Sequence, residues 1–323
     1  MSSVDNAKEE KCATNVEWAI MCSRSHDLDE LGAYLNLDTT RSGRLGELQT
    51  NARDATIAAF GPPRFTRLYY GVEFCERLVP AASQVRRAYE AATCRRLSFS
   101  LLTPYVTDAG LGRLWPLFEW LAALDDSSAE VVVNDWGVLH LLRRDFPRLR
   151  PVLGRLMNRM LRDPRIAGEF ASPQAPAAAL QVLRQSGVTA ALFRRFLGQV
   201  GITMVEFDNL LQGLDMNFRE FGLSASLYIP YGYVATGRVC AIGSLQLPRR
   251  QKFDVEAVCR QECRLNTLCF EYSDSPFGNR DQEFIEQGNT YFYCQDRRTI
   301  ASGAEMVERL GISRIVYQPR LPM

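Results

Sequence analysis

Four cysteines are the residues of this chain whose types and spacing best suit chemistry. Cys75 stands far upstream, whereas Cys240, Cys259 and Cys263 lie close together downstream. Thiolates are the usual ligands of iron-sulfur clusters, and one helical turn would place the sulfurs of Cys259 and Cys263 on one face. Cysteine is also among the most buried residue types, so inert core thiols are the alternative reading of the spacing.

The residues around these cysteines are rich in arginine. Cations close to a thiol lower its pKa and stabilise the anionic ligand set of a cluster, which is the chemistry that an iron-sulfur site needs. Six arginines that lie within about ten residues of a candidate ligand are Arg77, Arg238, Arg249, Arg250, Arg260 and Arg264.

The overall composition is that of a globular protein with a large core. The chain has 323 residues, 46% of them hydrophobic, with 38 basic and 37 acidic side chains. A net charge of +1 gives no indication of a nucleic-acid or membrane partner. No secretory signal or membrane-spanning run is expected, so the sequence predicts a cytoplasmic protein. Its nine cysteines, an odd number, favour thiols or a metal site over a disulfide framework.

Short β-branched or aromatic runs alternate with segments of helical periodicity. This alternation predicts a parallel sheet, and about eight repeats of it predict a (β/α)8 TIM-barrel-like α/β fold, with a doubly wound open sheet as the alternative. The expected strands are 16–21, 67–71, 97–101, 130–134, 152–154, 204–207, 226–230, 290–294 and 314–317. The expected helices are 78–92, 111–124, 136–144, 177–185, 189–200, 210–221 and 304–310.

The predicted organisation is one barrel-like domain over residues 15–323, preceded by a polar tail over residues 1–14. Residues 36–63 are rich in Thr, Arg, Gly and Asn and are expected to be an insertion or surface excursion. Residues 273–288 are rich in turn formers and are expected to form a loop near the site.

Three stretches resemble one known family. Residues 70–77 (YGVEFCER) and 131–138 (VVVNDWGV) look like an early strand-end motif and a central strand of the UbiU/UbiV-type proteins of the collagenase-like peptidase superfamily. Residues 231–240, followed by Cys259 and Cys263, are similar to the cysteine cluster of that family. The resemblance extends from about residue 70 to residue 317, most of the chain.

The resemblance implies a barrel fold and a 4Fe-4S cluster with Cys75, Cys240, Cys259 and Cys263 as ligands. It gives no ligand role to Cys12, Cys22, Cys94, Cys269 or Cys294. It also implies a component of an oxygen-independent hydroxylation system that acts on an aromatic or prenylated small molecule, as in ubiquinone biosynthesis. The implied partner is a second related iron-sulfur protein, in a heterodimer.

Other polar residues are candidates for positioning a substrate. Asp135 follows a buried strand, where barrel enzymes place catalytic groups, but it could equally cap the helix that begins at Trp136. Glu73 could act near the cluster or form a structural salt bridge. Tyr233 is the third catalytic candidate, and the glycines beside it, Gly232 and Gly237, allow close backbone approach.

Two other functions remain open. One is a non-catalytic iron-sulfur scaffold that supports a catalytic partner, and the other is an RNA base hydroxylase or a peptidase of the same superfamily. The near-neutral charge argues against RNA. The only histidines, His26 and His140, have no spacing typical of a serine or zinc protease.

Overall fold

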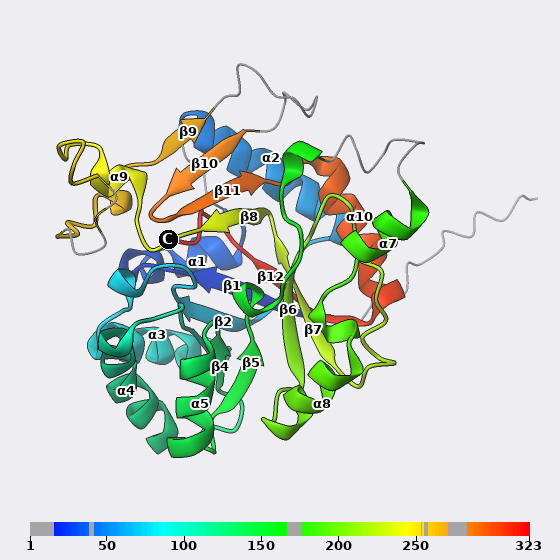
Figure 1. Cartoon of the computed structure of the whole chain (residues 1–323), viewed down its shortest axis with the longest axis horizontal. Coiled ribbons are helices and arrows are strands. Elements are labelled where there is room, and N and C mark those ends of the chain that lie inside the picture. The colour runs from blue at the N-terminus through cyan, green and yellow to red at the C-terminus, as the bar shows by residue number, and fades with distance from the viewer. Residues whose placement is uncertain (1–15, 39–41, 167–175, 253, 255–257, 271–282) are drawn as a thin grey trace, which may run out of the picture.

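Eight parallel strands close into a barrel in the computed structural model, which describes residues 16–38, 42–166, 176–252, 254, 258–270 and 283–323. Around the barrel the strands follow in the order β1 (Glu17–Cys22), β12 (Ile312–Tyr317), β7 (Ser224–Ile229), β6 (Met204–Asp208), β5 (Arg150–Leu153), β4 (Glu130–Val133), β3 (Ser98–Leu102) and β2 (Phe65–Gly71). The predicted (β/α)8 fold is therefore confirmed (Figure 1).

Helices follow most of the strands and cover the barrel from outside. They are α1 (Leu31–Leu35), α2 (Arg44–Phe60), α3 (Ala82–Cys94), α4 (Asp108–Ala123), α5 (Trp136–Asp145), α7 (Ala177–Leu183), α8 (Ala191–Gln199) and α10 (Arg297–Leu310). The short helix α9 (Ala241–Ser244) follows Cys240 and stands in a lobe beside the barrel. In α3 the buried side chains recur at helical spacing, at Val85, Ala88 and Ala92, so one face of that helix lies on the strands. None of the described helices is both long and apolar enough to cross a membrane.

Residues 36–63, which we expected to be an insertion, contain α2. This helix belongs to the first β/α unit and packs against α10 through Ala52, Ala55 and Ile300. The expectation was wrong because the polar residues of this segment cover the exposed face of the helix. Residues 1–14 lie outside the described residues.

A second sheet, which the sequence did not indicate, stands at the carboxyl end of the barrel. It is antiparallel, with the order β8 (Tyr231–Thr236), β11 (Thr290–Cys294), β10 (Phe284–Gln287) and β9 (Leu268–Phe270). The predicted strand at 290–294 belongs to this sheet and not to the barrel. All of it is inserted between β7 and α10, above the barrel in Figure 1.

The predicted helix at 210–221 does not form. Gly213 and Gly222 have φ of +73° and +66°, which a helix does not allow, and the segment is a series of turns. Its apolar residues, such as Leu214 and Phe218, are buried against the barrel. The apolar residues of this segment have helical spacing in the sequence, but they belong to a loop that packs against the barrel.

Charged side chains fill the amino-terminal end of the barrel interior. Arg314 donates to Glu130 over 2.8 Å and to the hydroxyl of Tyr69 over 2.6 Å, and Arg67 donates to Glu17 over 2.8 Å. Because Glu130 lies between two arginines, its pKa is lowered even though burial alone would raise it. These pairs keep the barrel interior closed at that end.

Candidate functional site

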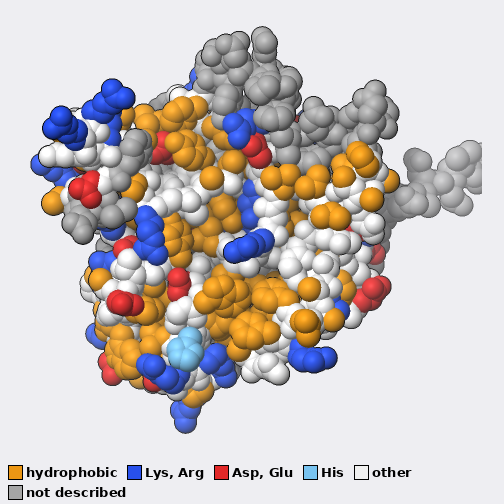
Figure 2. All heavy atoms as spheres, in the orientation of Figure 1, with side chains coloured by type: hydrophobic (Ala, Val, Ile, Leu, Met, Phe, Trp, Pro, Cys, Tyr) orange, Lys and Arg blue, Asp and Glu red, His pale blue; other side chains and the backbone are white. Residues whose placement is uncertain are grey.

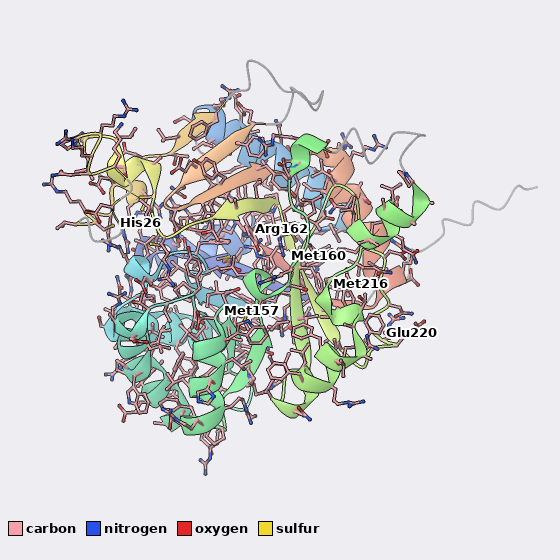
Figure 3. The ribbon with its side chains drawn as sticks, in the orientation of Figure 1. His26, Met157, Met160, Arg162, Met216 and Glu220 are labelled. Atoms are coloured by element: carbon pink, nitrogen blue, oxygen red, sulfur yellow. The ribbon has the colours of Figure 1, made fainter. Side chains whose placement is uncertain are left out.

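The barrel mouth, formed where the strands end, is closed by a buried ionic network. Arg155, which follows β5, donates to Glu73 over 3.1 Å and to Asp208 over 2.6 Å. All three residues are buried, with at most 1% of their surface exposed. Arg162 donates to the other oxygen of Asp208 over 2.7 Å. Figure 3 places Arg162 in the chain segment that lies over the centre of the barrel.

Aromatic rings enclose this network from both sides. The Arg155 guanidinium lies 3.8 Å from the ring centre of Tyr228 in the barrel, and Arg162 lies 4.6 Å from that of Tyr233 in the second sheet. Tyr233 also donates to the backbone oxygen of Arg155 over 3.2 Å. Burial raises the pKa of Glu73, against the effect of Arg155, while Glu73 and Asp208 raise the pKa of Arg155 despite its burial. The mouth is thus filled and charge-balanced.

The three candidate catalytic residues all have structural contacts. Glu73 forms the salt bridge to Arg155, and Tyr233, in strand β8 of the second sheet, is 5% exposed. Asp135 caps α5, accepting hydrogen bonds from the backbone of Gly137 over 2.7 Å and of Val138 over 3.1 Å. The backbone at Gly232 comes close to the ring of Tyr293, and not to any cysteine.

One pocket at the rim brings together Cys75, Cys240, Cys259 and Cys263. Cys75 lies just after β2, and Cys240 precedes α9 beyond the end of β8. Every pair among the four is close enough that a thiolate at one raises the pKa of another. Cys75 and Cys263 are 188 residues apart in the sequence, and the fold brings them together. Cys75 comes from the end of β2, and the other three cysteines come from the segment that contains the second sheet.

The predicted helical turn at 259–263 is absent. Gln261 has a left-handed conformation with φ of +57°, which breaks any helix before the short 3-10 turn Glu262–Arg264. Cys259 and Cys263 reach the pocket from an irregular segment, and not from one helix face.

Burial is the largest influence on the pKa of Cys75, Cys240 and Cys263. It raises the pKa of Cys75 to about 11 and that of Cys263 to about 12, and it also raises the pKa of Cys240. The nearby arginines therefore do not offset the effect of burial on these three thiols, contrary to our expectation. Backbone N–H groups oppose the effect, from Arg77 and Leu78 at Cys75 and from Gly243 at Cys240, the last over 3.3 Å.

The turn between β10 and β11 forms another wall of the pocket. Gly288 has φ of +63°, and a Cβ there would collide with Met323 Cε and lie 3.9 Å from Cys263 Sγ. Asn289 donates to the Phe74 carbonyl over 2.7 Å and to the Tyr105 hydroxyl over 3.1 Å. Gly288 is the last residue of the expected loop 273–288, and residues 273–282 of that loop lie outside the described residues.

The donor set fits a cluster better than a single ion. Within the described ranges, no three His, Cys, Asp or Glu side chains are close enough to hold one metal ion. A tetrahedral ion needs each sulfur about 2.3 Å from its centre, so the sulfurs would nearly touch. An iron-sulfur cluster places irons and sulfides between the thiolates and therefore needs a wider set of four.

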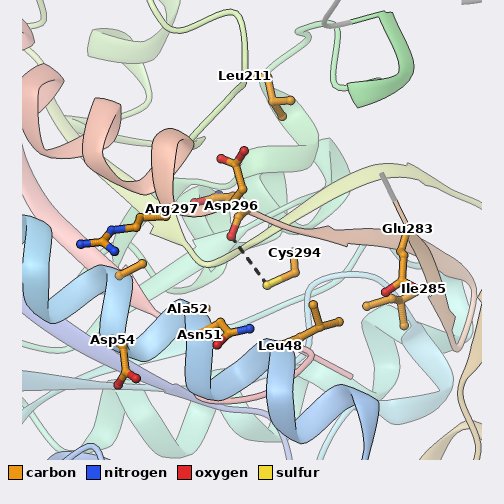
Figure 4. Close-up of a pocket in the computed structure, with 12 residues that line it drawn as sticks. Leu48, Asn51, Ala52, Asp54, Leu211, Glu283, Ile285, Cys294, Asp296 and Arg297 are labelled. Atoms are coloured by element: carbon orange, nitrogen blue, oxygen red, sulfur yellow. Dashed lines mark hydrogen bonds between the residues drawn. The ribbon is translucent and has the colours of Figure 1, made fainter. Parts of the chain in front are cut away.

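Cys294 lines a different cavity, of about 830 Å3, between α2, the second sheet and the start of α10 (Figure 4). Its thiol faces the backbone oxygen of Gln295 at 3.8 Å. Cys22 is buried at the end of β1, and Cys94 and Cys269 are exposed, so none of them joins the four. Cys12 lies outside the described residues.

The sequence missed Arg155, Arg162 and Asp208, and it missed the pocket wall around Tyr105. Asp208 and Arg155 could have been found from the sequence, because Asp208 ends a strand and Arg155 follows one. Barrel enzymes place functional side chains at such strand ends. Arg162 carried no such signal.

Comparisons with known proteins identify no family. No protein-family model and no curated protein matches the chain. Among solved structures, the spore cortex-lytic enzyme SleL of Bacillus megaterium QM B1551 matches with a TM-score of 0.33 at 10% identity, over 94% of this chain and 70% of that one. A glycoside hydrolase family 18 N-acetylglucosaminidase from Paenibacillus barengoltzii matches with a TM-score of 0.27 at 10% identity, over 94% of both chains. YKL-39 also has a TM-score of 0.27 and 10% identity, over 93% of this chain and 91% of that one.

Proposed function

We propose that this protein holds a 4Fe-4S cluster through Cys75, Cys240, Cys259 and Cys263 and serves in an oxygen-independent hydroxylation system for an aromatic or prenylated small molecule. The observation that carries the proposal is the meeting of these four cysteines, and of no other described cysteine, in one pocket. Hydroxylation rests on the sequence resemblance. When bound, such a cluster supplies one-electron chemistry.

The surroundings of the thiols support a cluster. Backbone N–H groups point at Cys75 and Cys240, and hydrogen bonds to sulfur tune cluster potentials. Burial disfavours the thiolate form because it removes water from around the charge. Ligation would offset this effect, because the positive charge of the metal would stabilise the thiolates in place of water. Arg77 and Arg238 line the same pocket and add positive charge.

A small cavity beside Cys75 is the proposed position of the substrate. It has a volume of about 190 Å3 and shares Cys75, Arg77, Arg238 and Asn289 with the cysteine pocket. Phe74, Glu76, Tyr105 and Thr107 complete its wall, so it offers an aromatic face and polar groups to a ring-sized part of a ligand. We assign the positioning of substrate to these residues in place of Glu73 and Tyr233, which are held in the network.

The closed barrel mouth favours a second candidate, the non-catalytic scaffold. Because Arg155 fills the position where barrel enzymes bind substrate, this chain could carry the cluster while a related partner performs the reaction. A peptidase is not supported, since His26 and His140 are both exposed on the surface of the protein.

Single substitutions test the ligand set. Replacing Cys75, Cys240, Cys259 or Cys263 by Ala should each abolish or degrade the cluster in anaerobically purified protein, measured by iron and sulfide content and visible absorbance. The matched controls Cys94→Ala, Cys269→Ala and Cys294→Ala should keep it. Loss of iron in Cys294→Ala equal to that in Cys259→Ala would contradict the assignment.

A further inference from the structure

The segment that carries three of the four cysteines is the most basic part of the surface around the pocket. Residues 238–266 contain six basic and three acidic side chains, a net charge of +3 in a chain whose net charge is +1. Figure 2 shows Lys and Arg side chains gathered on the lobe that contains α9. We call Arg238, Arg249, Arg250, Lys252 and Arg260, all exposed, the basic rim.

Most charges of the basic rim have no ion-pair partner among the described residues. Within the described part of the chain, Arg249, Arg250, Lys252 and Arg260 form no ion pair, and Arg238 contacts only the ring of Tyr105, at 5.6 Å. Some exposed arginines elsewhere are paired, as Arg144 is with Asp145 at 2.7 Å. Unpaired charges of one sign create a field that attracts an oppositely charged partner.

Exposed apolar side chains interrupt the basic rim. Leu245, Val258 and Leu265 are 54%, 85% and 91% exposed, and Val258 lies beside Cys259 on the wall of the pocket. Aliphatic side chains within a charged border are typical of a protein interface. Single-stranded RNA instead stacks on aromatic rings, and the only aromatic residue in 238–266 is Phe253, which lies outside the described residues.

We infer that the basic rim is the docking surface for an acidic one-electron carrier protein, an inference that rests on the proposed cluster. The carrier is oxidised by one electron and the thiolate-held centre is reduced by one, with no bond formed. Docking here brings the carrier to the side of the pocket where Val258 and Cys259 meet solvent. Such encounters are small, weak and steered by charge, so their affinity falls as salt rises.

The test measures binding directly. A fluorescently labelled, oxidised ferredoxin with a strongly acidic surface is titrated with the anaerobically prepared full chain, and its anisotropy gives Kd at low and high salt. The triple variant Arg249→Glu, Arg250→Glu, Lys252→Glu should raise Kd by about tenfold or more at low salt. The control Arg95→Glu, Arg148→Glu, Arg195→Glu makes the same change of charge on exposed sites outside the rim and should have a much smaller effect.

The outcomes separate this inference from the proposed function. Iron content and bleaching by dithionite report the cluster in both variants. If both are intact and the two triple variants bind the carrier equally, the docking inference is wrong and the cluster stands. If the wild type holds no cluster, both proposals fail. If a structured RNA binds the rim more tightly than the carrier does, the surface serves nucleic acid and the inference is overturned.

Discussion

Two regions at the carboxyl end of the barrel, the mouth and the cysteine pocket, differ in almost every physical property. In the mouth, Glu73, Asp208 and Arg155 are fully buried and paired with one another. In the pocket, Cys75, Cys240 and Cys259 are only partly buried, and the thiols face one another. The mouth has therefore become part of the core, and the groups suited to chemistry stand on the rim, held by the second sheet.

The largest expected effect comes from removing the centre of the mouth. Arg155→Met leaves Glu73 and Asp208 buried without their shared cation, which should lower the free energy of unfolding by about 3–5 kcal/mol. Urea denaturation measures this. The exposed Arg159→Met is the control and should change stability by less than about 0.5 kcal/mol. Equal stability of the two variants would show that the network does not hold the mouth.

A smaller effect should depend on pH. Glu206 lies in the barrel interior, where burial raises its pKa to about 8 from 4.5, and its Oε2 accepts from the Tyr228 hydroxyl over 2.7 Å. A carboxyl that stays protonated only when folded favours the folded state at low pH. This contribution is lost as pH rises from about 4.5 towards 8, by at most about 1.4 kcal/mol per unit.

Glu206→Gln keeps an acceptor for Tyr228 and removes the titration. Its stability relative to the wild type should therefore increase between pH 5 and pH 8, measured by urea denaturation at several pH values. A difference between the two proteins that does not vary with pH would contradict the buried, protonated carboxyl.

The wall of the pocket gives a third prediction. Asn289→Ala removes the hydrogen bonds to Phe74 and Tyr105 and should cost about 1–3 kcal/mol, because the buried Phe74 carbonyl loses its partner. Loss of iron to a chelator should become faster than in the wild type, since Cys75 follows Phe74. Unchanged chelation kinetics would mean that the wall does not control the site.

The smallest effect is expected at Asp135. Asn caps helices as well as Asp does, so Asp135→Asn should leave stability within about 0.5 kcal/mol, whereas Asp135→Ala should cost about 1 kcal/mol. If Asp135 only caps α5, both variants keep full activity once an assay exists. A large loss of turnover in Asp135→Asn at unchanged stability and iron content would restore its catalytic role.

The sequence predicted the barrel because most of its strands are short, fully buried apolar runs, such as Glu130–Val133, with periodic helices between them. It did not predict the second sheet. The strand β8 begins two residues after β7 ends, and β9 and β10 have only three and four residues, too short for a visible alternation.

The sequence predicted only part of the candidate site. Cysteine spacing pointed to Cys240, Cys259 and Cys263, whereas the resemblance of residues 70–77 to a family motif added Cys75, because spacing alone does not encode contacts of high sequence separation. The ionic network was hidden for the same reason, because Arg155 meets Glu73 from 82 residues away in the chain. Local rules included the helix cap as one of two open roles for Asp135, because that contact spans only two or three residues.

The central claim is that the rim pocket holds a cluster, and metal stoichiometry tests it most directly. Protein purified or reconstituted without oxygen should be brown and carry about four irons and four sulfides per chain. Protein that stays colourless, with all four thiols of the pocket free after anaerobic reconstitution, would contradict the account.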